Sequence, residues 1–420
     1  MSPTSLGTTG TGGWGSSASS TLFGIVRPCS ETPNLRTNVN KMVRFTRSGL
    51  AVAALCAAAV IFGQSSPEDE AIKRERENDV KLGKEYSERL DKELKFVEDA
   101  EKVAFVARIG AKLAEVANAT PVSAQYGDKR FFAFEYTFKL IEDKDVNAFS
   151  IPGGFIYVHS GLLDYVQSED ELAAVISHEI AHAAHRHVPT LIKERSKIDL
   201  WTLPVVIGAL LSGSPEAGTI LFTKDLLTQA LTSGWSQLAE VDADFAGAHY
   251  MLKTDYNPVA LLTFMERLAY RDRNGPNFDL GIHRTHPPSK ERARALLRFL
   301  KEHGVPIERS KVTTEFRVTS SIVDTGIQLK FGQRPLFVLA GDDAAARADE
   351  MVLALNRFFD ATPQQFEVKL SGRKILWNSK TLLEFDERDA REGVSPQAFA
   401  AEAYEKIRGA LFALSMRITN

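Results

Sequence analysis

The segment between Ser168 and Pro189 constrains the fold of this chain most, because it predicts one helix with two histidines on the same face. Ser168 is a good N-cap, and Glu171 follows three residues later in the capping-box pattern. We expect the helix to end before Pro189, since proline disrupts a helix interior. His178 and His182 are four residues apart, so their imidazoles project from one side of this helix, about one turn apart.

That spacing suits a single zinc ion, which imidazole nitrogen binds at about 2.0–2.1 Å. Glu179 lies between the two histidines and points off the ligand line, so it can take a proton from a zinc-bound water without occupying the metal. Zinc lowers the pKa of such a water to about 7, which lets a carboxylate generate the nucleophile at neutral pH. The five-residue pattern also occurs in helices by chance, as a pair of solvated or core histidines, so its surroundings have to decide.

A catalytic zinc needs three protein ligands and one open position. The three-histidine pattern of the metzincins would place its last histidine at position 188, which is a valine here. The alternative is a carboxylate from a later helix. Glu240 and Asp244 are four residues apart and share a helix face. Glu240 can bind zinc while Asp244 orients a ligand histidine through its other ring nitrogen. An acidic cluster of this kind is otherwise a solvated helix face.

Composition limits both the class of protein and its partners. The chain has 420 residues, of which 44% are hydrophobic and 25% charged, so we expect a globular protein with more than one folded unit. A net charge of -3 argues against an electrostatic grip on nucleic acid. The two cysteines, Cys29 and Cys56, lie upstream of the part expected to fold. Any metal must therefore be held by histidine and carboxylate.

The beginning of the chain has the pattern of an export signal. Residues 1–41 are rich in Gly, Ser and Thr and predict a disordered leader, or an extension upstream of the true start. Residues 42–64 combine arginines, an apolar stretch at 49–62 and small residues, as a secretory signal peptide does. The apolar stretch is short for a membrane span, and an uncleaved anchor through 49–62 is the alternative. We therefore expect a periplasmic or otherwise exported protein.

The remaining pattern predicts an α+β fold in two parts. The first, residues 65–305, is expected to be mostly helical with a small sheet. Its predicted helices and strands cover 67–119, 132–140, 155–158, 168–188, 235–252, 257–270 and 286–302. The second part, residues 310–420, is expected to be a separate α+β module of unknown function. Its predicted elements cover 311–330, 335–339, 343–359, 366–370, 375–377 and 396–414.

Four motifs together resemble the M48 family of zinc metallopeptidases, in particular its soluble secreted bacterial members. They are NAFSIPGG at 147–154, HEIAHAAHRH at 178–187, EVDAD at 240–244 and HPPSKER at 286–292, in the order of the family. The resemblance implies a zincin-like fold and a gluzincin-type site with one Zn2+ per chain. It implies that His178, His182 and Glu240 bind the metal and that Glu179 is the base. It also implies a substrate cleft bordered by Asn147, Ala148, Phe149, Ser150, Pro152, Gly153 and Gly154.

The last motif adds two candidate catalytic residues. His286 is expected to face the open zinc position, where it either donates to the developing oxyanion or occupies the metal and holds the enzyme inactive. Arg292 either assists it or fixes the loop. A donor aimed at developing charge is typically worth about 10²–10³ in rate. We interpret His187 as helix-end packing. His185 lies on the face of His178 and His182 in a continuous helix, and its role is open.

The sequence therefore favours a metalloendopeptidase that hydrolyses peptide bonds in misfolded or misassembled exported proteins. Its expected partners are polypeptide substrates, with peripheral membrane and outer-membrane proteins among the candidate clients, and not nucleic acid. The alternative is a chaperone-like protein that binds clients, in which the peptidase site is latent.

Overall fold

The computed structural model describes residues 66–194, 235–274, 281–286, 289–389 and 393–418. The predicted leader 1–41 and the predicted signal or anchor at 42–64, including its apolar stretch 49–62, lie outside the described residues. Within the described residues, no helix is both long enough and apolar enough to cross a membrane.

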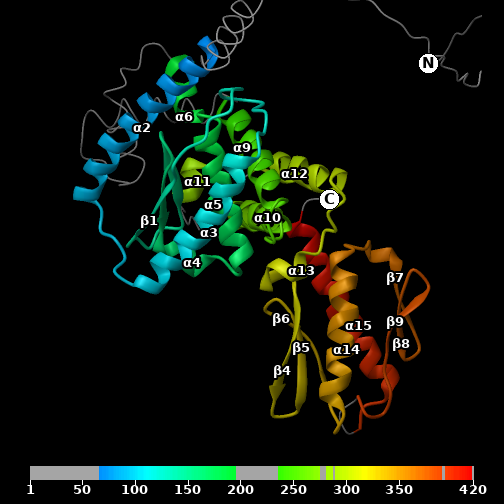
Figure 1. Ribbon diagram of the computed structural model, residues 1–420. Helices are drawn as coiled ribbons and strands as arrows, with labels where there is room; N and C mark the ends of the chain where they lie inside the picture. Colours follow the sequence, from blue (N-terminus) through cyan, green and yellow to red (C-terminus); the bar gives the residue numbers. More distant parts are fainter. Residues whose placement is uncertain (1–65, 195–234, 275–280, 287–288, 390–392, 419–420) are drawn as a thin grey trace, which may run out of the picture. The chain divides into compact units, whose positions relative to one another are not determined.

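The first part of the chain is mostly helical, with a small sheet (Figure 1). Its helices are α2 (Pro67–Glu93), α3 (Ala100–Ala119), α4 (Ser160–Tyr165), α5 (Glu169–Ala184), α6 (His187–Glu194), α9 (Trp235–Met251), α10 (Val259–Asn274), α11 (Gly281–Thr285), α12 (Lys290–Glu302) and α13 (Arg309–Val312). The sheet has the order β1-β3-β2, with strands β1 (Thr137–Ile141), β2 (Ala148–Ile151) and β3 (Phe155–His159). β1 is parallel to β3 and β2 is antiparallel to it, so β2 is an edge strand.

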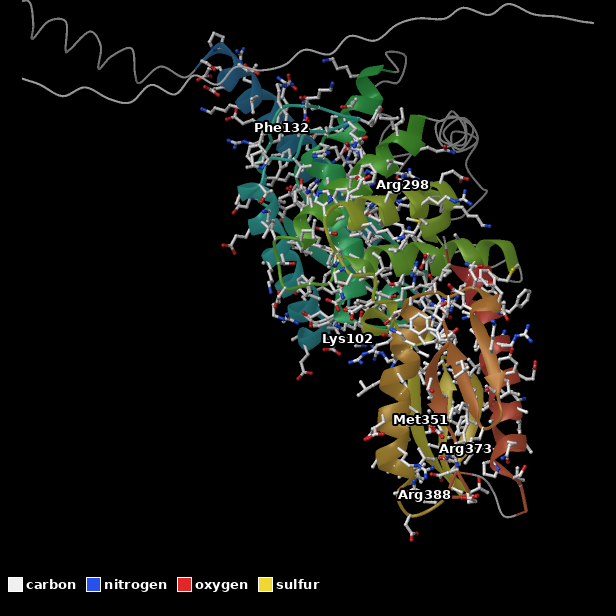
Figure 2. All side chains as sticks on the ribbon, turned by 90° about the vertical axis from the view of Figure 1, so that its right-hand side faces the viewer. Lys102, Phe132, Arg298, Met351, Arg373 and Arg388 are labelled. Carbon is white, nitrogen blue, oxygen red and sulfur yellow. The ribbon has the colours of Figure 1, made fainter. Side chains whose placement is uncertain are left out.

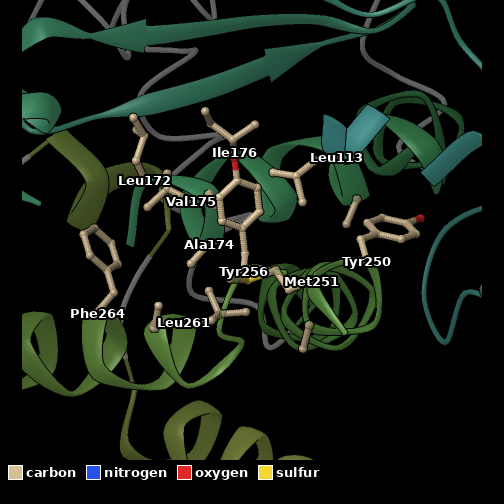
Figure 3. Packing of buried hydrophobic residues seen from close by; sticks show 14 of the residues in the cluster. Leu113, Leu172, Ala174, Val175, Ile176, Tyr250, Met251, Tyr256, Leu261 and Phe264 are labelled. Atoms are coloured by element: carbon tan, nitrogen blue, oxygen red, sulfur yellow. The ribbon is translucent and has the colours of Figure 1, made fainter. Parts of the chain in front are cut away.

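Helix α5 lies at the centre of the core of this part. It contacts α3, α9, α10 and strand β2, and 14 of its 16 residues are buried. Figure 3 shows Leu172 and Ile176 of α5 packing among side chains such as Leu113 of α3, Met251 of α9 and Leu261 of α10. A helix that is buried on every side has no solvated face for its polar residues. The histidines and glutamates of α5 must therefore be satisfied inside the protein.

The predicted N-terminus of α5 is confirmed at Ser168, whose hydroxyl accepts the backbone N–H of Glu171 at 3.2 Å. The reciprocal half of the capping box is not formed. The Glu171 carboxylate accepts the backbone N–H of Gln167 at 2.8 Å and pairs with the buried Arg267. The helix ends at Ala184, before Pro189 as predicted.

Two predicted elements of the first part begin at least four residues later in the structure. The strand expected over 132–140 is shortened to β1, because residue 134 exchanges both backbone hydrogen bonds with the Asn118 side chain, at 2.8 and 3.2 Å, and not with a strand. The helix expected over 286–302 begins only at Lys290, where Ser289 caps it by accepting the N–H of Arg292 at 3.0 Å. His286 consequently lies outside that helix, just after α11.

The C-terminal part places two helices between two small sheets (Figure 1). Its elements are η2 (Thr314–Phe316), β4 (Val318–Val323), β5 (Gly326–Phe331), β6 (Arg334–Leu339), α14 (Ala344–Asp360), η3 (Gln365–Glu367), β7 (Val368–Ser371), β8 (Lys374–Trp377), β9 (Lys380–Glu384) and α15 (Pro396–Arg417). Helix α14 contacts β4, β5 and β9, and α15 contacts β6, β7 and β8. Figure 2 shows Met351 on α14 and Arg373 at the turn between β7 and β8. The α+β fold class is confirmed.

Candidate metal centre

The close approach of α5 and α9 brings the two predicted motifs together. Gly247 of α9 makes this possible: a Cβ there would lie 3.1 Å from the backbone nitrogen of His178. Ala243 of α9 is fully buried. Small residues at a helix contact let the backbones approach closely. The face of α9 that carries Glu240 and Asp244 therefore lies against the histidine face of α5.

Four donor atoms converge on one point. Nε2 of His178 lies 3.0 Å from Nε2 of His182 and 3.3 Å from a Glu240 oxygen. Nε2 of His182 lies 3.4 Å from the other Glu240 oxygen. Nδ1 of His286 lies 3.3 Å from Nε2 of His178 and 3.1 Å from both Glu240 oxygens. Ligand atoms at about 2.0–2.1 Å from a tetrahedral zinc lie about 3.3–3.4 Å apart. The residues therefore fit a zinc ion in both donor chemistry and spacing.

Asp244 and Arg292 support two of these donors from behind. Oδ1 of Asp244 lies 3.0 Å from Nδ1 of His178, on the side of the ring away from the other donors. Arg292 donates to both Asp244 oxygens at 2.8 Å and lies 2.9 Å from Glu240. The side chains of Asp244, Arg292 and Glu240 are at least 95% buried. Arg292 thus contacts the carboxylates of Asp244 and Glu240.

Glu179 faces the same centre. Its Oε1 lies 3.2 Å from Nε2 of His286. Burial raises the pKa of the Glu179 carboxyl, while the charge of His286 and a hydrogen bond with Ser150 act in the opposite direction. A raised pKa makes a carboxylate a stronger base for taking a proton.

The charges of the metal-free centre are divided unequally between its histidines. Burial disfavours the charged form of His178, but hydrogen bonds with Asp244 and Glu240 outweigh this and raise its pKa to about 10. Burial holds the pKa of His182 well below its ordinary value. The pKa of the Glu240 carboxyl is lowered despite burial, because His286, Arg292 and His182 surround it. The centre therefore carries protons that a metal ion has to displace.

The segment expected to border the substrate cleft divides into two halves. Ser150 of β2 contacts Glu179, and the Asn147 amide oxygen accepts the Thr285 hydroxyl at 3.1 Å, next to His286. Ala148 and Phe149 are buried between these two residues. The turn residues Pro152, Gly153 and Gly154 form the other half. A Cβ on Gly153 would lie 2.6 Å from Cα of Val80 in α2, so this turn packs tightly under that helix.

A second histidine group, not predicted from the sequence, lies beside the first. His185 is the C-cap of α5 and does not belong to the first donor cluster. Its Nδ1 contacts Asp242, and His187 contacts both Asp242 and His182. Asp242 lies between Glu240 and Asp244 in the acidic motif. Its position there was the feature of the sequence from which this second group could have been predicted.

Comparisons with known proteins match part of the chain to a peptidase family. Residues 107–299 match the model of peptidase family M48. The chain is 31% identical over 141 residues to a beta-barrel assembly-enhancing protease of Yersinia pestis, 33% over 172 residues to the mitochondrial metalloendopeptidase OMA1 of Schizosaccharomyces pombe, and 31% over 172 residues to the metalloprotease LoiP of Escherichia coli. These matches cover 33%, 41% and 40% of this chain and 29%, 48% and 64% of the relatives.

Proposed function

The chain belongs to peptidase family M48 through residues 107–299, and from this we propose that it is a zinc-dependent metalloendopeptidase. His178, His182 and Glu240 would hold the metal, one Zn2+ per chain. The convergence of their donor atoms at 3.0–3.4 Å, with Glu179 beside them, is the observation that carries the proposal. Zinc in such a site supplies Lewis acidity, which polarises a peptide carbonyl and makes a water molecule acidic near neutral pH.

Glu179 performs the proton transfers in this proposal. Its carboxylate takes the proton of the attacking water, and it then delivers a proton to the leaving amine. Burial raises the pKa of this carboxyl, which makes it a stronger base for taking the proton of the water. Ser150, through its hydrogen bond with Glu179, would hold the carboxylate in place.

His286 caps the centre in this proposal. Its Nδ1 occupies the fourth vertex of the donor cluster, where the substrate carbonyl has to enter. The side chain lies outside the regular helices, so it can leave that vertex without unwinding one. We expect His286→Ala to increase casein cleavage if capping dominates. A decrease of about 10²–10³ would instead assign His286 to oxyanion stabilisation.

The substrate would be an extended polypeptide added to strand β2. This strand is the edge of its sheet, and it carries Ser150, which reaches Glu179. A peptide that pairs with an edge strand gains main-chain hydrogen bonds whatever its sequence. Misfolded or misassembled exported proteins present such segments. The predicted export signal and the name of the Yersinia pestis relative support this substrate class, and an exported location.

Glu179→Gln tests the proposed chemistry. The amide cannot take a proton, so we expect casein cleavage to fall by about 10²–10⁴ while one zinc per chain is retained. Metal content is the matched control, since it separates loss of the base from loss of the site. Casein cleavage that survives this change would show that the mechanism is wrong.

A second candidate function is chaperone-like client binding by the C-terminal part. It is favoured by the large apolar side chains exposed there: Ile322, Leu353, Phe366, Leu370, Phe412 and Met416. If the wild type cleaves no polypeptide while the C-terminal part holds an unfolded one, this candidate replaces the first.

A further inference from the structure

A hydrogen-bonded chain of three buried side chains leads away from the candidate metal centre. Nδ1 of His182 lies 2.9 Å from Nδ1 of His187, and Nε2 of His187 lies 3.0 Å from Oδ2 of Asp242. His182, His187 and Asp242 are 9%, 4% and 2% exposed. Water therefore has little access to these nitrogens, and their protons must be assigned to protein partners.

The partners of His187 determine where its proton lies. Its Nε2 also lies 3.2 Å from the carbonyl oxygen of Tyr126. Because both partners of Nε2 are acceptors, Nε2 carries the proton. The Nδ1 atom of a neutral His187 is then an acceptor, so Nδ1 of His182 must donate to it. This leaves Nε2 of His182 without a proton and with its lone pair directed at the metal position, the form that binds zinc.

The turn that places His187 is strongly held. Arg186 adopts a left-handed backbone conformation with φ 53°, which costs free energy in a residue with a side chain. Its guanidinium pairs with Asp79 at 2.6 Å, with Asp128 at 2.8 Å and with Glu75. The guanidinium also lies 4.6 Å from the ring of Phe132, which is labelled in Figure 2. These contacts offset the strain and fix the direction of the following residue.

Asp242 is fixed just as firmly. Its Oδ1 accepts the backbone N–H groups of Gln125 and Tyr126, while its Oδ2 contacts both His185 and His187. The same loop is locked to the turn, since the N–H of Asp128 donates to the carbonyl of His185 at 2.8 Å. A Cβ on Gly127 would lie 2.2 Å from that carbonyl oxygen, so the loop approaches as closely as glycine allows.

We propose that His187 and Asp242 are positioning residues for the metal centre, acting as a relay that holds His182 in its zinc-binding tautomer. The inference rests on the proposed function, in which His182 binds zinc. The two ligand histidines are then supported differently. Asp244 contacts His178 directly, whereas Asp242 acts on His182 through the ring of His187.

A second metal ion among His185, His187 and Asp242 is the competing account, because these residues also cluster. The contacts favour the relay. Both imidazoles have the same Asp242 oxygen as a hydrogen-bond partner, and Nε2 of His187 also faces the carbonyl oxygen of Tyr126. The other oxygen is already occupied by backbone N–H groups.

Zinc affinity, measured by competition with a chromophoric chelator, tests the relay without relying on activity. We expect His187→Phe and Asp242→Asn to weaken zinc binding by about 10–100-fold, the usual effect of losing an outer partner of a ligand histidine. His249→Phe is the matched control. His249 lies on α9 and, like Asp242, lines a cavity of about 270 Å³ whose wall also includes Arg298 (Figure 2). It does not contact the relay. Its zinc affinity should equal that of the wild type.

Nitrogen-15 NMR of histidine-labelled wild-type protein, zinc-loaded, covers the case in which a variant fails to fold. We expect His182 to carry its proton on Nδ1 and His187 on Nε2. Coordination of His182 through Nδ1, or unchanged zinc affinity in folded His187→Phe, would overturn the relay and leave the proposed function intact. Two zinc ions per wild-type chain, one of them lost in Asp242→Asn, would replace the relay by a metal site. A wild type that binds no zinc would instead refute the proposed function.

Discussion

The two parts of the chain treat charge and apolar surface in opposite ways. Before residue 314 the described residues bury many ionisable groups, including the metal centre, Arg267, Glu266 and Arg309. After residue 313, Asp389 is the one buried charged side chain among the described residues, while six large apolar side chains are exposed. Burying charge is costly unless every group is paired, and surplus apolar surface marks contact sites. The first part is therefore organised for chemistry and the second for packing and contact.

Removing one ion-paired arginine from each part should show the difference between the two parts most strongly. Arg292→Met leaves Asp244 and Glu240 buried without their cation, so we expect the metal-free protein to lose about 3–5 kcal/mol of unfolding free energy. Arg347→Met should cost less, about 1–3 kcal/mol, because its partner Asp389 keeps the backbone N–H of Asp386 at 2.7 Å. Urea unfolding measures both.

Zinc provides the control for that pair. Saturating zinc should restore part of the stability of Arg292→Met, since the ion compensates Glu240, and should do nothing for Arg347→Met. Equal losses in the two variants, unaffected by zinc, would contradict the assignment of charge chemistry to the first part.

The stability of the metal-free protein should fall as the pH rises from about 7 to 10. The pKa of His178 is about 10 in the folded protein and the pKa of His286 is also raised, against about 6.5 unfolded. A raised folded pKa gives stability that is complete below the unfolded pKa and is lost as the pH approaches the folded one. His182 and His187, with lowered pKa values, are neutral in both states across this window.

We expect a slope of about 1 kcal/mol per pH unit in protein treated with a chelator, measured by urea unfolding at pH 7, 8 and 9. Zinc affinity should change in the opposite direction and strengthen with pH, because binding displaces these protons. Stability that is flat or rising over this range would show that the centre does not hold the protons assigned to it.

The smallest effect on stability is expected from the exposed apolar side chains of the C-terminal part. Phe366→Ser and Phe412→Ser should change the unfolding free energy by no more than about 0.5 kcal/mol, since the two rings are 76% and 60% exposed. If this surface holds clients, KM for casein rises while kcat is unchanged. Lys369→Ser, a polar change on exposed strand β7, is the control. An unchanged KM in all three variants would show that this surface does not bind casein.

The sequence pattern was sufficient for predictions that depend on the spacing of residues along a single helix. The start of α5 at Ser168, its end before Pro189 and the shared face of His178 and His182 follow from spacing along one helix. The approach of Glu240 to these histidines joins two helices, and the order of the four family motifs predicted it. The structure also gives the C-terminal part most of the expected order of strands and helices. However, β9 was missed, and the first residues of the segment 311–330, expected as strands, form the end of α13 and η2. Its short sequence Lys-Thr-Leu-Leu-Glu places two leucines side by side and lacks the alternation of a strand.

Tertiary contacts explain the rest. Nothing in the residues around Arg186 announces a left-handed backbone, because the three carboxylates that hold it come from α2 and from residue 128. The turn of His187 toward Asp242 was consequently not predictable. The same holds for the aromatic alternation at 132–136, where the Asn118 side chain replaces a neighbouring strand. The sequence pattern there predicted which side chains face the core, but not which groups the backbone is hydrogen-bonded to.

The most direct test of the central claim is the metal content of purified wild-type protein and of His178→Ala. This change removes one donor and the contact to Asp244, and leaves α5 with a residue that favours helices. The account predicts one zinc per wild-type chain and loss of that zinc in the variant, with the helical content of both proteins equal by circular dichroism. A zinc content that is the same in the two proteins would contradict it.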